Sequence, residues 1–215
     1  MACHGFIVTV PEIYHEFEPA GTALSYVGTA GVERGNELKI TKTIAAYDSD
    51  SASSVAFLAS HPDCTGAVGV MGFCIGGHLA YRAALNKGVR AAACFYATDL
   101  HKGTLGKGMN DDSLGRCGEL AAAGTEMCMI WGRQDPHVPN DGRMRVLAAF
   151  TDANVNFTWH EFNGQHAFMR DEGPRYDGEL AMHCYAMCAA LFRRKLGAGD
   201  LPVPATAAAA GETKH

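Results

Sequence analysis

Cys74 stands at the centre of a short motif suited to nucleophilic catalysis, Gly72-Phe73-Cys74-Ile75-Gly76-Gly77. The motif follows an apolar run and opens a helix-like segment, which is the strand–turn–helix context of a nucleophile elbow. Glycines at 72 and 76 let the backbone turn tightly, and a helix N-terminus stabilises an anion. The motif predicts that Cys74 is a nucleophile and that the Ile75 amide donates to an oxyanion. For an isolated motif of this kind, a small buried cysteine in a turn is the alternative.

An aspartate and a histidine follow two later apolar runs. Asp135 lies in Arg133-Gln134-Asp135-Pro136-His137, and His166 ends Asn163-Gly164-Gln165-His166. Taken singly, Asp135 is typical of a turn before proline and His166 of a surface loop. The order Cys, Asp, His after three strand-like runs is that of α/β-hydrolases. The joint pattern favours a triad in which His166 is the base and Asp135 orients it.

Strand-like and helix-like segments alternate along the chain. This predicts an α/β fold with a mainly parallel sheet, helices on both faces, and a ligand site at the carboxyl ends of the strands. The expected strands are residues 5–10, 67–72, 90–96, 126–131 and 156–162. The expected helices are residues 33–44, 48–60, 75–86, 141–153 and 178–196.

The remaining segments complete the expected domain. The sequence predicts that residues 99–124 form a surface loop with at most a short helix, because they are glycine-rich and charged. Tyr14 follows the first expected strand, so it is a candidate for lining the pocket. We expect residues 1–196 to form a single domain and residues 197–215, which have no core-forming pattern, to be a flexible tail.

Residues 72–78, 131–139 and 164–168 resemble the three signature regions of the dienelactone hydrolase family, which belongs to the α/β-hydrolase superfamily. The resemblance runs from about residue 5 to residue 196. It implies a carboxylic ester hydrolase of the carboxymethylenebutenolidase type, which cleaves a small activated ester or enol-lactone through a thioester acyl-enzyme on Cys74. It also implies that Arg170 faces a substrate carboxylate, with Arg34 as a candidate second arginine.

Members of that family begin with further strands and a helix before the strand expected at residues 5–10. A loop in that part supplies the second oxyanion donor and a glutamate that contacts the nucleophile. Glu12 and Glu16 follow the wrong strand, so neither is assigned this role. The expected fold is therefore an N-terminally incomplete α/β-hydrolase. The alternative function is a catalytically weak or inactive protein or fragment that lacks the second oxyanion loop.

The composition and charge of the chain limit which partners and cofactors we expect it to bind. The 215-residue chain has a net charge of −5 and no basic run longer than Arg193-Arg194-Lys195, which disfavours nucleic acid and anionic membranes as partners. No P-loop or G-x-G-x-x-G motif opens a helix, so no nucleotide cofactor is expected. The eight cysteines include no C-x-x-C pair, and we expect most to be reduced thiols in the cytoplasm. A metal or redox protein using His183, Cys184 and Cys188 is a second alternative, although we expect no metal.

Overall fold

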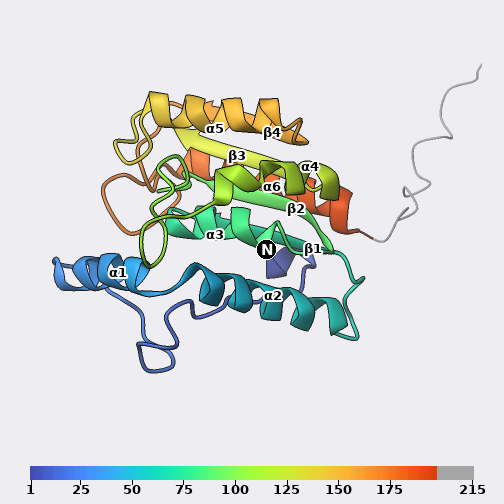
Figure 1. The fold of residues 1–215 in the computed structure, drawn as a ribbon, viewed down its shortest axis with the longest axis horizontal. Coiled ribbons are helices and arrows are strands. Elements are labelled where there is room, and N and C mark those ends of the chain that lie inside the picture. The colour runs from blue at the N-terminus through green and yellow to red at the C-terminus, as the bar shows by residue number, and fades with distance from the viewer. Residues whose placement is uncertain (198–215) are drawn as a thin grey trace, which may run out of the picture.

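Four parallel strands form the centre of the protein, seen here in a computed structural model that describes residues 1–197. They lie in the order β1 (Val68–Phe73), β2 (Val89–Phe95), β3 (Glu126–Gly132) and β4 (Phe157–Phe162). Every neighbouring pair is parallel and consecutive in sequence (Figure 1). The carboxyl ends of all four strands therefore meet at one edge of the sheet.

Helices cover both faces of this sheet. The α-helices of the described residues are α1 (Ala30–Thr41), α2 (Ile44–Ser60), α3 (Ile75–Ala83), α4 (Cys117–Ala123), α5 (Asn140–Asp152) and α6 (Gly178–Leu196). Short 3-10 turns occupy Ala2–His4 and Ser113–Arg116. Side chains of α2, α3, α4 and α5 pack in one apolar core and those of α6 in another, on the opposite face.

The buried strand β2 shows why both faces are covered. Ala92 and Cys94 point into the core shared with α3 and α5, whereas Ala91, Ala93 and Phe95 point into the core shared with α6. All five side chains are fully buried. A strand buried on both faces has a continuous apolar sequence, which is the pattern that identified this segment.

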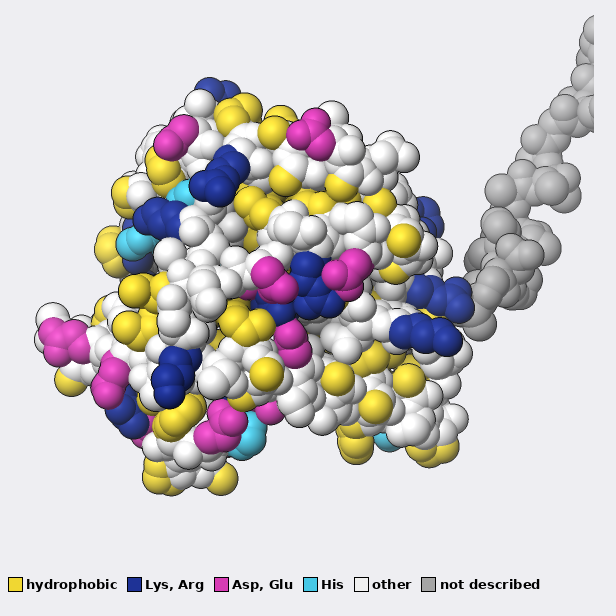
Figure 2. All heavy atoms as spheres, viewed as in Figure 1, with side chains coloured by type: hydrophobic (Ala, Val, Ile, Leu, Met, Phe, Trp, Pro, Cys, Tyr) yellow, Lys and Arg dark blue, Asp and Glu magenta, His cyan; other side chains and the backbone are white. Residues whose placement is uncertain are grey.

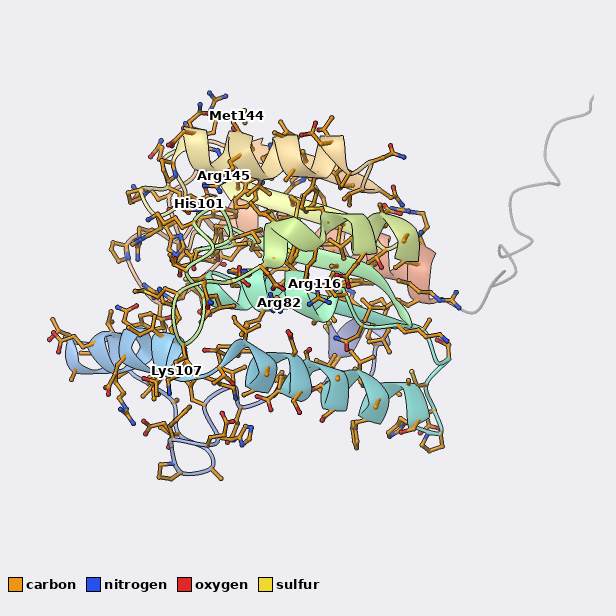
Figure 3. The ribbon with its side chains drawn as sticks, in the orientation of Figure 1. Arg82, His101, Lys107, Arg116, Met144 and Arg145 are labelled. Carbon is orange, nitrogen blue, oxygen red and sulfur yellow. The ribbon has the colours of Figure 1, made fainter. Side chains whose placement is uncertain are left out.

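A buried arginine joins α3 to the surrounding segments on one face of the molecule. Arg82 is 3% exposed, and its guanidinium pairs with Asp48 of α2 at 2.8 Å and with Asp111 and Asp112 at 2.6 and 2.8 Å. Figure 2 shows basic and acidic side chains gathered at the middle of this face, and Figure 3 shows Arg82 there beside Arg116. These pairs hold the 99–113 segment against the helix that follows β1.

The predictions for four strands and four helices are confirmed to within three residues at each end. The helix expected at 178–196 has the bounds of α6, and the strand expected at 126–131 is β3 with one more residue. The sheet is parallel and carries helices on both faces, as expected. The helix expected at 48–60 is less accurate, because α2 begins at Ile44.

The predicted strand at residues 5–10 is wrong. Residues 6–10 have no regular secondary structure; Phe6 packs edge-to-face on Phe192 at 6.1 Å, while Val8 and Val10 are 47% and 85% exposed. β-branched residues favour an extended backbone, but a strand also needs the hydrogen bonds of a neighbouring strand. Among the described residues, no strand pairs with this segment. Tyr14 therefore follows an irregular segment rather than a strand.

Two further boundaries differ from the expected ones. The helix expected at 33–44 ends as α1 at Thr41, and α2 begins four residues before the expected helix at 48–60. The hydroxyl of Thr43 accepts a hydrogen bond from the Ala46 N–H at 3.1 Å, which caps α2 and separates the two helices.

The 99–124 segment is not all surface loop. Leu100, Leu105 and Leu120 are at most 1% exposed, and the segment contains α4. Two apolar cores on one sheet support our proposal that residues 1–196 form one domain. The tail prediction, apart from Gly197, lies outside the described residues.

Candidate active site

Cys74 occupies a sharply turned position between β1 and α3. Its backbone has φ 58° and ψ −122°, a conformation that non-glycine residues rarely adopt and that is concentrated at functional sites. The Cys74 N–H donates to the Phe95 carbonyl at 3.1 Å, and its own carbonyl accepts from the Gly77 N–H at 3.0 Å. These bonds hold the half-buried side chain at the carboxyl edge of the sheet.

Glycines make this turn possible, but the structure requires glycine at only some of the glycine positions in the motif. A Cβ on Gly72 would lie 1.9 Å from the carbonyl oxygen of Gly76, and one on Gly77 would lie 2.5 Å from the Phe95 carbonyl oxygen. A Cβ on Gly76 would have no atom within 4 Å. Gly72 and Gly77 are therefore required by close backbone approach, whereas the position of Gly76 has space for a side chain.

This difference gives a matched pair of substitutions. We expect Gly72→Ala to lower the free energy of unfolding by at least about 2 kcal/mol, because backbone atoms must shift to admit the methyl group. We expect Gly76→Ala to leave it unchanged or raise it by up to about 1 kcal/mol, because alanine favours the helix. Urea unfolding of both variants measures the difference, and equal midpoints would show that the turn is not packed in this way.

Asp135 and His166 meet at the same edge of the sheet. Asp135 follows β3 by three residues and His166 follows β4 by four, and they are 4% and 5% exposed. The His166 Nδ1 lies 2.7 Å from Asp135 Oδ2, while Asp135 Oδ1 accepts from the His137 N–H at 2.7 Å. Because Asp135 engages Nδ1, the Nε2 atom of His166 is left for the thiol.

The charges of the three side chains support one another. Burial alone would raise the pKa of Cys74, but His166, the Thr98 hydroxyl and the Ile75 amide together lower it. Burial alone would lower the pKa of His166, but its interactions with Asp135 and Cys74 raise it to about 9. Burial opposes ionisation of Asp135, and the bond with His166 lowers its pKa below the usual range. The arrangement favours a thiolate beside an imidazolium.

A cavity of about 860 Å³ opens beside Cys74 at this edge. Its walls come from the strand ends, from α1 and from the irregular segment between residues 11 and 26. Five of the seven site residues predicted from the sequence line the cavity, whereas Asp135 and Arg34 do not. The five are Tyr14, Cys74, Ile75, His166 and Arg170. The size of the cavity suits a small-molecule ligand.

The two candidate arginines lie in different places. Arg170 lines the cavity, with its Nε donating to the Glu172 carbonyl at 2.9 Å and its guanidinium 4.1 Å from the centre of the Tyr26 ring. Arg34 does not line the cavity and pairs instead with Glu18 at 2.6 Å and Glu37 at 2.9 Å. Of these two arginines, the structure therefore places only Arg170 at the cavity beside Cys74. Tyr14 contributes a hydroxyl that donates to the Gly35 carbonyl at 3.3 Å.

Three further residues of the site, His137, Tyr96 and Thr98, were not predicted from the sequence. The rings of His137 and Tyr96 lie 4.5 and 4.9 Å from the His166 ring, and each meets it edge-on. The Thr98 hydroxyl lies 3.7 Å from Cys74 Sγ. Tyr96 and Thr98 lie one and three residues after the end of β2, so their place at the carboxyl end of this strand could have identified them.

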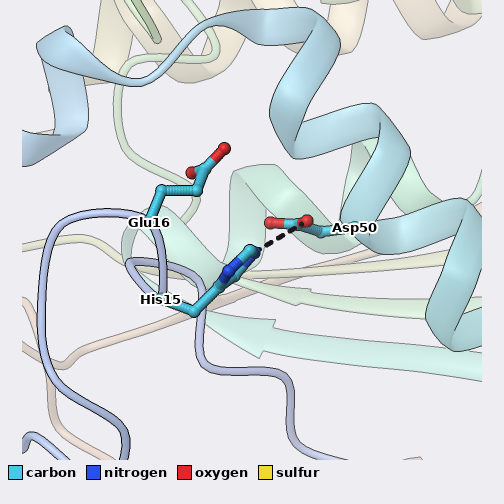
Figure 4. A group of neighbouring side chains, drawn as sticks. All are labelled: His15, Glu16 and Asp50. Carbon is cyan, nitrogen blue, oxygen red and sulfur yellow. Dashed lines mark hydrogen bonds and ion pairs between the residues drawn. The ribbon is translucent and has the colours of Figure 1, made fainter.

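A group of side chains with metal-binding chemistry lies nearby, formed by His15, Glu16 and Asp50 (Figure 4). The buried Lys42 ammonium already lies 2.5 Å from both Glu16 and Asp50, so these carboxylates neutralise a cation of the protein itself. His15 pairs with Asp50 at 3.1 Å, and together these contacts fix the 11–22 segment against α2. The group is therefore explained as a structural ion-pair cluster.

The alternative metal site on the last helix does not assemble. Cys184 and Cys188 are buried in the core beneath α6, whereas His183 is exposed and meets the Phe162 ring edge-on at 5.7 Å. Within residues 1–197, these three side chains do not form a group that could hold a metal ion. All eight cysteines are free thiols, and five of them are buried.

The comparison with protein families decides the classification. A family model described as the dienelactone hydrolase family matches residues 1–196. The chain belongs to the dienelactone hydrolase family. This places it among carboxylic ester hydrolases of the α/β-hydrolase superfamily, as the resemblance of the three motifs implied.

Individual relatives agree with this membership. The chain is 40% identical to a Saccharomyces cerevisiae protein named "Putative carboxymethylenebutenolidase", over 91% of this chain and 72% of that protein. It is 24% identical to a carboxymethylenebutenolidase from a Pseudomonas species, over 94% of this chain and 78% of that protein.

A solved structure gives the fold independently. An α/β-hydrolase from a deep-sea metagenome library matches with a TM-score of 0.51 and 18% identity, over 68% of this chain. This chain spans 63% of the length of the protein in that structure. In the described part of the chain, no helix is both long and apolar enough to cross a membrane.

Proposed function

We propose that this member of the dienelactone hydrolase family hydrolyses a small activated carboxylic ester or enol-lactone through a thioester on Cys74. The observation that carries the proposal is that Cys74 and His166 line one cavity from two strand ends, while Asp135, from a third strand end, binds His166. The His166–Asp135 distance of 2.7 Å supports the orienting role of the carboxylate. The pKa of Cys74, which lies below its ordinary value, supports a thiolate nucleophile.

Each step follows from these positions. The Cys74 thiolate attacks the ester carbonyl carbon, and the oxyanion of the tetrahedral intermediate accepts a hydrogen bond from the Ile75 N–H. The protonated His166 then gives its proton to the leaving alkoxide or enolate, and a thioester forms. A water molecule next attacks the thioester as His166 takes one of its protons. The acid leaves, and the thiolate and imidazolium are restored.

The leaving group decides which substrates this site favours. A thiolate leaves a tetrahedral intermediate more readily than an ordinary alkoxide, so acylation of Cys74 proceeds well only when the substrate oxygen is itself a good leaving group. Enol esters and enol-lactones meet this condition. Arg170 adds a guanidinium that suits a substrate carboxylate, and Tyr14 forms part of the same cavity wall. Arg34 lies outside the cavity, so we assign it no substrate contact.

Arg170 gives a direct test of the substrate class. We expect Arg170→Gln to raise KM for a carboxylate-bearing enol ester by roughly 10- to 100-fold, because a charge-assisted hydrogen bond is lost. The KM for an uncharged enol ester of the same size should change less than about threefold. Arg34→Gln is the matched control, with neither value changed. Equal losses for the two esters would contradict the role of Arg170.

The alternative function is a catalytically weak or inactive protein of the same fold. It predicts that the purified protein hydrolyses enol esters slowly or not at all at every pH, which a turnover assay with both esters checks. The free thiols of all eight cysteines support our further proposal that the protein works in a reducing compartment, the cytoplasm.

A further inference from the structure

The Thr98 hydroxyl lies within hydrogen-bonding distance of the sulfur of Cys74. The hydroxyl oxygen lies 3.7 Å from Cys74 Sγ, and the Thr98 side chain lines the same cavity as His166 and Ile75. His166 and the Ile75 N–H also lower the pKa of Cys74. None of the steps derived above uses the Thr98 hydroxyl.

The backbone of Thr98 is fixed to the elbow at both of its polar groups. The Thr98 N–H donates to the Cys74 carbonyl at 3.3 Å, and the Thr98 carbonyl accepts from His78 Nδ1 at 3.0 Å. Flanking residues Tyr96 and Asp99 have φ angles of 35° and 64°, which non-glycine residues rarely adopt. Such strain persists only where the surrounding structure imposes it. Thr98 is therefore held in register with Cys74.

A buried network extends this support into the protein. The His78 ring is fully buried, and its Nε2 lies 3.0 Å from the Ser113 hydroxyl and 3.1 Å from Asp111 Oδ2. Asp111 in turn pairs with Arg82 at 2.6 Å, which Figure 3 labels on α3. The groups that position Thr98 thus come from α3 and from the 99–113 segment, and hydrogen bonds and ion pairs join them.

We propose that the Thr98 hydroxyl donates a hydrogen bond to the Cys74 thiolate and holds the nucleophile ionised and oriented. This inference rests on the proposed function, since it assigns a positioning role at the same sulfur. The thiolate is acceptor-only, so at the observed separation the hydroxyl must be the donor once the thiol has lost its proton. Donation to the charged form favours that form.

Other titratable groups also face Cys74. His166 lowers the pKa of Cys74, and the charge of Cys74 contributes to raising the pKa of Tyr14 and of Tyr96. Burial raises the pKa of both tyrosines above the ordinary value, so they stay uncharged at neutral pH. The cavity also contains the charged side chains of Arg170 and of Asp99, which is paired with Lys39 at 2.7 Å. These groups are unchanged by substitution of Thr98, so they form a constant background.

The test is the pH dependence of iodoacetamide alkylation, followed at Cys74 by site-resolved mass spectrometry without any substrate. We expect Thr98→Val to raise the apparent pKa of Cys74 by roughly one unit, so that alkylation below that pKa slows about tenfold. Thr98→Ser retains the hydroxyl and should stay within about 0.3 units of the wild type. Thr98→Ala provides a second hydroxyl-free variant if Thr98→Val does not fold by circular dichroism.

Two results would overturn the proposal. An unchanged pKa in the hydroxyl-free variants would show that Thr98 only fills space, and a lowered pKa would show that the neutral thiol donates to Thr98. The proposed function is tested separately, by ester turnover of the wild-type protein. A wild type that hydrolyses no ester would refute that function while leaving the alkylation result on Thr98 readable.

Discussion

Replacing Cys74 with alanine is expected to reduce kcat for an enol ester by roughly 10⁴- to 10⁶-fold, which is the scale of losing a triad nucleophile. The proposed reaction passes through a bond between Cys74 Sγ and the acyl carbon, so no other side chain at the cavity can take over this step. The cavity and the His166–Asp135 pair should remain, because the substitution removes a single sulfur atom. We therefore expect KM to change far less than kcat.

Cys64 supplies the matched control for this experiment. It is a half-exposed free cysteine that does not line the cavity, so Cys64→Ala should retain full activity. Steady-state turnover of the wild type and both variants gives the comparison. Loss of activity in both cysteine variants, or in neither, would refute the assignment of Cys74 as the nucleophile.

Replacing Asp135 with asparagine is expected to lower kcat by about 10⁴-fold while leaving the fold intact. The carboxylate accepts a hydrogen bond from His166 Nδ1 at 2.7 Å. Because Asp135 is only 4% exposed, solvent screens the attraction between its charge and the imidazolium very little. An amide of the same shape does not stabilise the imidazolium, and it can hold the ring in the wrong tautomer. Exposed Asp141 is the control, and Asp141→Asn should leave kcat within about twofold.

The same substitution should change the pH profile in a defined direction. Burial opposes the protonation of His166, but Asp135 and Cys74 raise its pKa to about 9, so the imidazolium persists through neutral pH and is lost above that value. Wild-type kcat should therefore fall on the alkaline side near pH 9. In Asp135→Asn the fall should begin at lower pH, because the charge that stabilises the imidazolium is absent. A profile that stays in place would contradict the role of Asp135.

The sequence was sufficient for the parts of the protein that depend on local chemistry. Glycines around Cys74 indicate the nucleophile elbow. Short apolar runs indicate the strands of the sheet, which are buried on both faces. Asp135 and His166 could be placed because parallel strands bring their carboxyl ends to one edge. The same geometry explains why three residues separated by up to 92 positions form one site.

The remaining parts depend on long-range contacts that no local pattern encodes. Residues 6–10 have strand-like composition, yet the described chain offers them no pairing strand. Arg34 is a candidate only through the family resemblance, and in the structure it pairs with Glu18 and Glu37 instead. Thr98 has an ordinary place after β2, and only its bonds to Cys74 and His78 reveal its proximity to the sulfur.

The central claim is that an acyl group is carried on the sulfur of Cys74, and mass spectrometry of a quenched reaction measures this directly. Asp135→Asn protein mixed with an activated enol ester and quenched in acid should gain the mass of one acyl group. Fragmentation should place that group on Cys74, and Cys74→Ala protein should gain nothing. Turnover of the ester with no acyl group on Cys74, or with the group on another residue, would contradict the account.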